Sequence, residues 1–187
     1  MVPSWPGRGG TPCRYCHTPH MPAREDAPIL VAYASKHGST QAVADRVGEV
    51  LSRAALEVDV RRTKEVRDLA GYRAVVLGAP IYNGRWHHHA RRFLERHRPT
   101  LSALPVAIFA LGPRTADQEA WRRSQSQFDR ALGEFPWLSP QSTQLFGGAD
   151  PPKGDQETRR RDVRDWPAIE AWAQAQAQLL QFHPGGS

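Results

Sequence analysis

The chain has 187 residues, 40% of them hydrophobic and 24% charged, as in an ordinary globular protein that is long enough to bury a core. No apolar run reaches the roughly 18 residues that span a bilayer, and the polar start lacks the apolar segment of a secretory signal, so we expect a cytoplasmic protein with no transmembrane segment. The net charge is +6, almost all of the positive charge is arginine, and no basic stripe alternates with aromatic residues, so we do not expect nucleic-acid binding.

The first predicted elements follow a proline- and glycine-rich tail, residues 1–27, which we expect to be disordered. The apolar run "ILVAYA" (29–34) stops at a polar turn, which indicates a buried strand. Apolar residues then recur at helical spacing from Val43 to Ala54, and "EVDVR" (57–61) alternates like a second strand.

The middle of the chain repeats this pattern. "RAVVLGAP" (73–80) reads as a third strand, and the link before it (62–72) is short enough for only a turn or a brief helix. A second helical face follows, made of Trp86, Ala90, Phe93, Leu94, His97 and Leu101. "PVAIFAL" (105–111) is a fourth strand, and the next helical face is Trp121, Gln125, Phe128 and Leu132.

The last third of the chain completes the alternation. "STQLFGG" (142–148) predicts a fifth strand, and the polar segment Gly147–Arg164 predicts a mobile loop. A last helix covers Trp166 to Leu180, with Asp165 as its N-cap. Strands that alternate with helices predict an α/β domain, residues 28–182, with a parallel sheet covered on both faces; residues 183–187 form a second tail.

Two patterns could bind metal. "CRYCH" (13–17) matches the attachment motif of c-type haem, but that reaction takes place outside the cytoplasm. A zinc site would need a second pair of cysteines, which the chain lacks. Successive residues of a helix point in different directions, so His87–His89 cannot all reach one ion. We expect no metal and consider Met21 a candidate for the true start of the protein.

The corner after the first strand, "SKHGST", has the chemistry of a phosphate site. A helix N-terminus offers free N–H groups and a partial positive charge to an anion. The hydroxyls of Ser35, Ser39 and Thr40 add donors, Lys36 adds charge, and Gly38 permits a close backbone approach. An ordinary capped helix would share some of these residues.

Two further corners follow strands whose carboxyl ends meet at the same edge of the sheet. "GAPIYNGRW" contains Tyr82 and Trp86, which could stack on a flat ring, and Asn83-Gly84, which favours a tight turn. "LGPRTAD" contains Gly112-Pro113 but no aromatic residue.

These motifs carry a family resemblance. "YASKHGST" resembles the phosphate loop of flavodoxins. "LGAPIYNGRWHHHARRFLERH" and "DVRDWPAIEAWA" resemble the flavodoxin-like, menaquinone-dependent protoporphyrinogen oxidase group and related actinobacterial flavodoxin-domain proteins. The resemblance implies a flavodoxin-like three-layer sandwich with a five-stranded parallel sheet in the order 2-1-3-4-5.

The resemblance also implies FMN as the cofactor. Residues 35–40 would hold its phosphate, and the loops at 79–86 and 111–114 would flank its ring. The expected cofactor-binding residues are Ser35, Lys36, His37, Gly38, Ser39, Thr40, Ala79, Pro80, Ile81, Tyr82, Asn83, Gly84, Trp86, Gly112, Pro113 and Arg114. No side chain stands out as a catalytic acid or base.

Other charged residues have weaker assignments. One histidine of His87–His89 could relay protons at the flavin rim, because histidine titrates near neutral pH. The arginines at 85, 91, 92 and 114 could hold the carboxylates of a porphyrin or another anion; a solvated basic face is the alternative.

The resemblance leaves three functions open. The first is an FMN-dependent oxidoreductase that oxidises protoporphyrinogen IX in haem biosynthesis and passes electrons to a quinone, with peripheral contact to a membrane. The second is a flavodoxin-type electron carrier that serves a redox protein partner. The third is a flavodoxin-like binding module without catalysis. Flavodoxins are acidic and this chain is basic, which counts against the carrier.

Overall fold

The computed structural model describes residues 26–150 and 161–181. The predictions for the Cys13–His17 motif, for the Met21 start and for the tail at 183–187 fall outside the described residues. The same holds for most of the tail at 1–27 and for the middle of the loop at 147–164.

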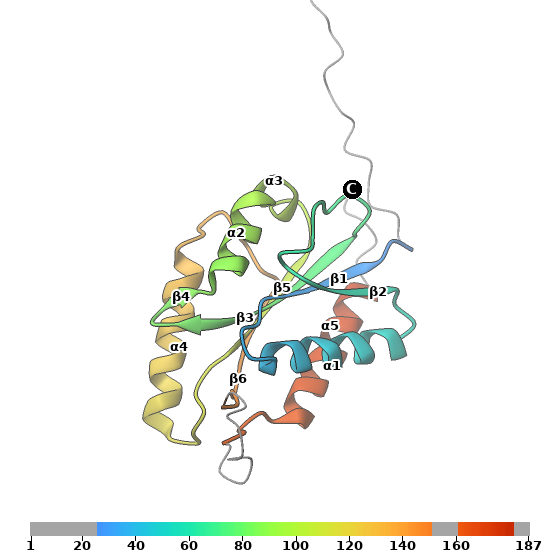
Figure 1. The fold of residues 1–187 in the computed structure, drawn as a ribbon. Helices are drawn as coiled ribbons and strands as arrows, with labels where there is room; N and C mark the ends of the chain where they lie inside the picture. Colours follow the sequence, from blue (N-terminus) through green and yellow to red (C-terminus); the bar gives the residue numbers. More distant parts are fainter. Residues whose placement is uncertain (1–25, 151–160, 182–187) are drawn as a thin grey trace, which may run out of the picture.

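The sheet has the predicted parallel arrangement (Figure 1). β1 (Ile29–Tyr33) lies between β2 (Val58–Arg62) and β3 (Ala74–Tyr82), and the order of the sheet is β2-β1-β3-β5-β6. These five strands pair in parallel, with β5 at Val106–Leu111 and β6 at Ser142–Phe146. The sixth, β4 (Arg85–Trp86), pairs with β3 alone. With β4 set aside, this is the predicted order 2-1-3-4-5.

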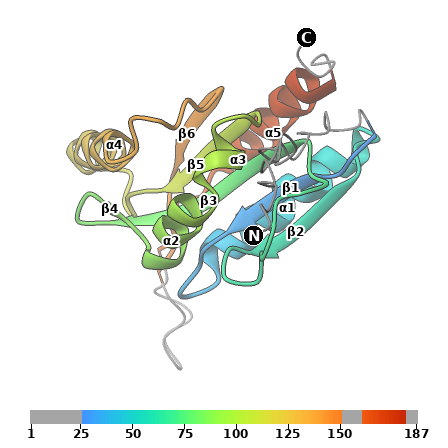
Figure 2. The same ribbon diagram turned by 90° about the horizontal axis from the view of Figure 1, so that it is seen from above.

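Helices cover both faces of the sheet (Figure 2). α1 (Ser39–Arg53) and α5 (Trp166–Gln181) lie on one face. The other face carries three helices: α2 (His88–Arg96), α3 (Arg98–Leu101) and α4 (Gln118–Gly133). The architecture is a three-layer α/β sandwich.

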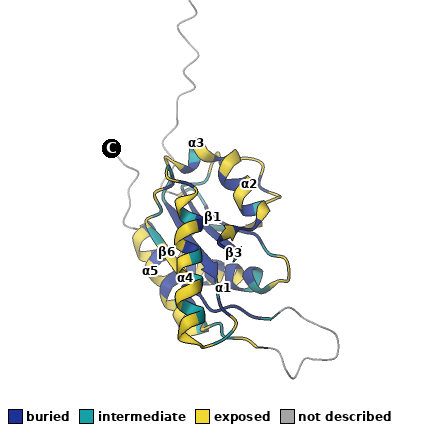
Figure 3. Ribbon diagram, turned by 90° about the vertical axis from the view of Figure 1, so that its left-hand side faces the viewer, coloured by how far each residue is buried: buried dark blue, intermediate teal, exposed yellow. Residues whose placement is uncertain are grey.

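Alternate residues of the central strands fill two separate cores. In β1, Leu30 and Ala32 face the core under α2 and α4. Ile29, Val31 and Tyr33 face the core under α1 and α5. All five residues are buried, so β1 has to be apolar on both faces (Figure 3). The unbroken apolar run of the sequence is a direct consequence.

The region after β3 differs from the prediction. The strand runs on to Tyr82, and a two-residue turn returns the chain to β4, pairing Ile81 with Trp86. Both turn residues have positive φ, 52° at Asn83 and 75° at Gly84, which is the usual geometry of an Asn-Gly hairpin. Trp86 therefore belongs to a strand, and the helix that was predicted from Trp86 begins at His88.

The same predicted helix is also divided near its end. α2 ends before His97, and the short helix α3 begins at Arg98. Pro99 lies in the first turn of α3, where its missing amide costs nothing; inside a continuous helix it would break the hydrogen-bond ladder. A proline that terminates α2 is the physical reason for the split.

Several local predictions are confirmed. The link between β2 and β3 is a turn without a helix. The Asp165 carboxylate accepts a hydrogen bond from the Ala168 amide at 3.0 Å, which caps α5. No helix in the described part of the chain is long and apolar enough to cross a bilayer.

Candidate cofactor site

The corner between β1 and α1 is built around a glycine. Gly38 is the N-cap of α1 and has a φ of 88°, a conformation that side chains with a Cβ rarely adopt. Its amide donates to Ser35 Oγ at 2.9 Å, which closes the turn. Glycine has no side chain that could accept hydrogen bonds from the amides of the first turn, and that turn contains no acidic residue. The positive end of the helix is thus left for an external anion.

The predicted residues of three loops meet at one hollow of about 90 Å³ at the carboxyl edge of the sheet. The first loop contributes Ser35, Lys36, His37, Ser39 and Thr40. The β3 loop contributes Pro80, Ile81 and Tyr82, and the β5 loop contributes Gly112 and Arg114. The convergence comes from the parallel sheet, which brings these strand ends together.

The remaining predicted residues are placed differently. Ala79 is fully buried in the sheet. The carbonyl of Pro113 accepts a hydrogen bond from the Gly148 amide at 2.8 Å. Asn83 lines a neighbouring hollow of about 250 Å³. Gly38 and Gly84 shape the backbone turns beside the hollows.

Tyr82 is the exposed aromatic residue of the site. It borders three hollows, of about 90, 540 and 250 Å³, and 42% of its surface is accessible. Its ring can therefore pack against a flat ligand.

Trp86 is placed where the prediction did not expect it. Only 4% of its surface is accessible, and its indole N–H donates to the Ala131 carbonyl of α4 at 2.8 Å. The ring edge packs on Phe128, with the centroids 5.9 Å apart. The prediction that Trp86 offers a second stacking face is corrected, because its ring fixes β4 to α4.

The β5 loop is held by a neighbouring segment that the sequence reasoning did not assign to the site. Gly148 and Ala149 line the hollow, and a Cβ on Gly148 would stand 2.9 Å from the Gly112 carbonyl oxygen. Only glycine permits this close approach of two backbones. The Gly147-Gly148 pair directly after an apolar strand was the signal in the sequence that could have revealed it.

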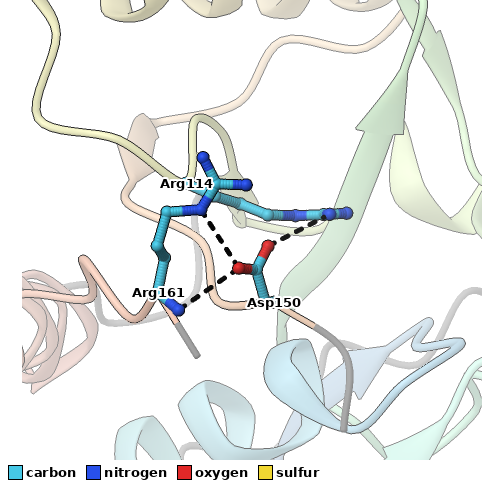
Figure 4. Close-up of polar contacts among 3 residues, drawn as sticks. All are labelled: Arg114, Asp150 and Arg161. Atoms are coloured by element: carbon cyan, nitrogen blue, oxygen red, sulfur yellow. Dashed lines mark hydrogen bonds and ion pairs between the residues drawn. The ribbon is translucent and has the colours of Figure 1, made fainter. Parts of the chain in front are cut away.

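An acidic side chain fixes the arginine of this loop (Figure 4). The Asp150 carboxylate forms two ion pairs. Its Oδ1 lies 3.5 Å from Arg114 Nη1, and its Oδ2 lies 3.1 Å from Arg161 Nε. Hydrogen bonds from Arg161 lower the pKa of the Asp150 carboxyl, so it stays ionised. The position of Arg114 is thereby set from outside the loop.

The histidines begin α2 on the other side of Tyr82. His87 is 8% exposed, and its Nδ1 accepts from the His89 amide at 3.3 Å as the helix cap. Burial lowers its pKa to about 4, and the nearby charges of His88, His89 and Lys36 act in the same direction. His87 is thus a neutral ring near pH 7, and the described residues include no group of three side chains arranged to hold a metal.

The four arginines separate into two groups. Arg85 and Arg114 line hollows of the site. Arg91 pairs with Glu95 at 2.9 Å one turn along α2, and Arg92 borders none of these three hollows. A ring of all four arginines at the mouth of the site is not present.

The donors of this site suit a phosphate ester that carries a flat ring. The hollow is lined by Lys36, by the hydroxyl residues Ser35, Ser39 and Thr40 next to a glycine N-cap, and by the exposed Tyr82. No carboxylate side chain lines the hollow among the described residues. A parallel sheet with this order and an anion corner at the β1/β3 switch point defines the flavodoxin-like class of α/β proteins, in which that corner holds FMN.

The comparison with known families agrees with this class. The model of the flavodoxin domain family matches residues 30–151, and the chain belongs to that family. FMN is the cofactor of flavodoxins, which supports the predicted cofactor.

Individual relatives are distant. Protoporphyrinogen IX dehydrogenase (quinone) of Escherichia coli K12 is 24% identical over 84 residues, which are 44% of this chain and 46% of the relative. The chain thus spans about half the length of the curated relatives it matches. Among solved structures, the two-electron reduced flavodoxin of Megasphaera elsdenii is 18% identical with a TM-score of 0.53, covering 80% of this chain and 98% of that one. Oxidised flavodoxin 1 of Bacillus cereus is 15% identical with a TM-score of 0.55, covering 82% and 98%.

Proposed function

We propose that this chain is an FMN-dependent oxidoreductase whose cofactor phosphate binds at residues 35–40 and whose flavin ring lies between the loops at 79–86 and 111–114. The observation that carries the proposal is the uncapped N-terminus of α1 behind Gly38, which shares one hollow with Tyr82 and Gly112. This chemistry fits both ends of FMN.

When bound, FMN supplies the exchange of one or two electrons, and the protein supplies binding and electrostatics. The first-turn amides and the hydroxyls of Ser39 and Thr40 would stabilise the phosphate dianion by donating hydrogen bonds to it. Tyr82 would cover one face of the ring. The backbone of Gly112 would approach the ring edge, since no side chain intervenes there.

For the reaction, we propose oxidation of protoporphyrinogen IX to protoporphyrin in three successive two-electron steps, with one quinone reduced to a quinol in each step. The match to the E. coli dehydrogenase supports this choice, although it covers less than half of each chain. The basic lining of the site, with Lys36, Arg85 and Arg114, suits a substrate with carboxylates. A location in the cytoplasm, with contact to a quinone-containing membrane, belongs to the same proposal.

A flavodoxin-type carrier is the second candidate. The observation in its favour is the exposed Tyr82 beside a loop without aromatic residues, which would leave one edge of a flavin open to a redox partner.

The first experiment tests the phosphate corner. We expect purified protein to bind FMN, seen as flavin absorbance and quenched flavin fluorescence, about tenfold or more tightly than riboflavin, which lacks the phosphate. The double variant Ser35→Ala and Thr40→Ala should lose that preference. Ser52→Ala, an exposed serine near the far end of α1, should keep it. Equal binding of FMN and riboflavin by a folded wild type would reject the site.

The second experiment separates enzyme from carrier. FMN-loaded protein is given protoporphyrinogen IX and menadione, and porphyrin fluorescence is followed. Formation of protoporphyrin faster than in the protein-free control supports the oxidoreductase. FMN binding without turnover, together with rapid electron exchange with a redox protein, supports the carrier.

A further inference from the structure

β2 is the outermost strand at one side of the sheet, next to β1 (Figure 2). Glu57 and Thr63, on either side of it, hydrogen-bond to β1 through their backbone at 2.8 and 2.9 Å. Because backbone groups alternate between the two sides of a strand, Val58, Val60 and Arg62 direct theirs away from β1. Within the described residues, no strand pairs with that side. β2 therefore has an open edge.

Two side chains of β2 carry opposite charges and are held in place. Asp59 Oδ2 accepts a hydrogen bond from Arg61 Nε at 2.6 Å and one from the Tyr72 hydroxyl at 2.5 Å. Burial, together with this hydrogen bond, raises the pKa of Tyr72 to about 12, so the hydroxyl keeps the proton that it donates. Among the residues that the structure describes, Asp59 Oδ1 and the two Nη atoms of Arg61 have no partner. Each side chain can therefore bind a second group of opposite charge.

The charges of β2 are complementary to themselves in one register. A closed pair of identical strands is two-fold symmetric and antiparallel. When the pair is centred on Val60, Asp59 of each copy lies opposite Arg61 of the other copy. When it is centred on any other residue of the strand, like charges lie directly opposite, for example Asp59 against Asp59 of the other copy, and this destabilises a sheet.

The backbone and the faces of β2 fit the same register. Val58 and Val60 pack under α1, so Asp59 and Arg61 lie together on the opposite face of the sheet. The Val60 amide of each copy would donate to the Val60 carbonyl of the other copy. In the same way, the Arg62 amide would donate to the Val58 carbonyl. The open edge and the two charges thus define one arrangement.

We propose that β2 pairs with β2 of a second copy of this chain, antiparallel and centred on Val60, to form a two-fold dimer with one continuous sheet. Charged side chains on an edge strand usually prevent such pairing, but here they select a register. The strands of the two copies run in opposite directions, so the two cofactor sites lie at opposite ends and stay open. This inference goes beyond the proposed function and does not depend on it.

Sedimentation equilibrium of the intact chain, between about 1 and about 500 µM, tests the dimer. A contact of one strand from each copy is small, so we expect monomer and dimer to exchange. The average mass should rise from that of the monomer toward that of the dimer and no further, because a two-fold contact closes on itself. A mass that stays at the monomer value, as when another segment covers this edge, overturns the proposal. So does a mass above that of the dimer.

Charge reversal locates the contact. Asp59→Arg and Arg61→Asp each place like charges opposite in the proposed register, so each should weaken dimerisation about tenfold or more. An equimolar mixture of the two variants should dimerise again, because each variant supplies the charges that the other lacks. Both substitutions in one chain should also restore the dimer, since exchanging the two charges keeps them complementary.

Arg123→Asp is the matched control. Arg123 is also an exposed arginine paired with a carboxylate, that of Glu119 at 2.8 Å, but it lies on α4, on the far side of the molecule from β2 (Figure 2). This variant should dimerise like the wild type, and urea unfolding shows whether each variant is folded. A dimer that persists in both single variants, or that the mixture of folded variants fails to restore, overturns the proposal.

Discussion

Gly38 is the residue on which the proposed phosphate site depends most. Its φ of 88° turns the chain from β1 into α1, and its amide is held by Ser35. No atom lies within 4 Å of the position that a Cβ would take there, so a substitution would act through backbone strain rather than through a clash.

We predict that Gly38→Ala lowers the free energy of unfolding by about 1–2 kcal/mol and weakens FMN binding about tenfold. The matched control is Gly71→Ala, which has a φ of 91°, equally open surroundings, and a position before β3, at the opposite edge of the sheet. It should show the same loss of stability in urea unfolding with unchanged FMN affinity. Parallel losses of affinity in both variants would contradict the role given to Gly38.

His87 should make stability depend on pH. Its pKa is lowered to about 4 in the folded protein and is about 6.5 in the unfolded chain. Between these two pH values His87 binds a proton in the unfolded chain but not in the folded protein. The free energy of unfolding therefore decreases as the pH falls from about 6.5 to about 4. In His87→Gln the slope of unfolding free energy against pH in this range should decrease by at most ~1.4 kcal/mol per pH unit. An unchanged slope in urea titrations would show that His87 is not buried as a neutral ring.

At the scale of elements, the local patterns predict the strands and most helices because burial on one or two faces leaves a period in the sequence. One exception, the division between α2 and α3, has a local cause in Pro99. The other involves a contact that is distant in the chain. Trp86 has helical spacing to Ala90, yet its ring docks on Phe128 and Ala131 some forty residues later. In the same way, no local pattern predicts that Gly78 lies directly against the Phe109 ring.

The N-cap of α5 tests an element that was predicted correctly. Asp165→Ala removes the acceptor of the Ala168 amide and should lower the free energy of unfolding by about 1 kcal/mol. Asp165→Asn keeps an acceptor and should restore most of the loss. Thermal unfolding followed by circular dichroism measures both. If alanine and asparagine behave alike, the cap contributes nothing in solution.

At the scale of the molecule, the parallel sheet allows the location of the site to be predicted, but not all the residues that form it. Three loops were expected at one edge, and they meet there. The contributions of Gly148 and Asp150 depend on how the chain after β6 returns beside β5, which no local motif specifies.

The net charge of +6 should affect the rate of electron transfer to charged reagents. We predict that oxidation of the reduced, FMN-loaded protein by ferricyanide, a small polyanion, slows about tenfold between about 0.01 M and about 1 M salt. Oxidation by neutral menadione should change much less, and stopped-flow absorbance measures both rates. A rate with ferricyanide that rises with salt would show that the flavin edge is locally acidic.

The backbone pairing beside the β5 loop has a consequence for how this protein can vary. Ala149 pairs with Asp162, the Gly148 carbonyl accepts a hydrogen bond from the Val163 amide, and Asp150 binds Arg161. Because the same Asp150 carboxylate also pairs with Arg114, its replacement by a neutral residue would take this partner from two guanidinium groups at once. Positions 114, 150 and 161 are therefore coupled and are expected to change together rather than one at a time.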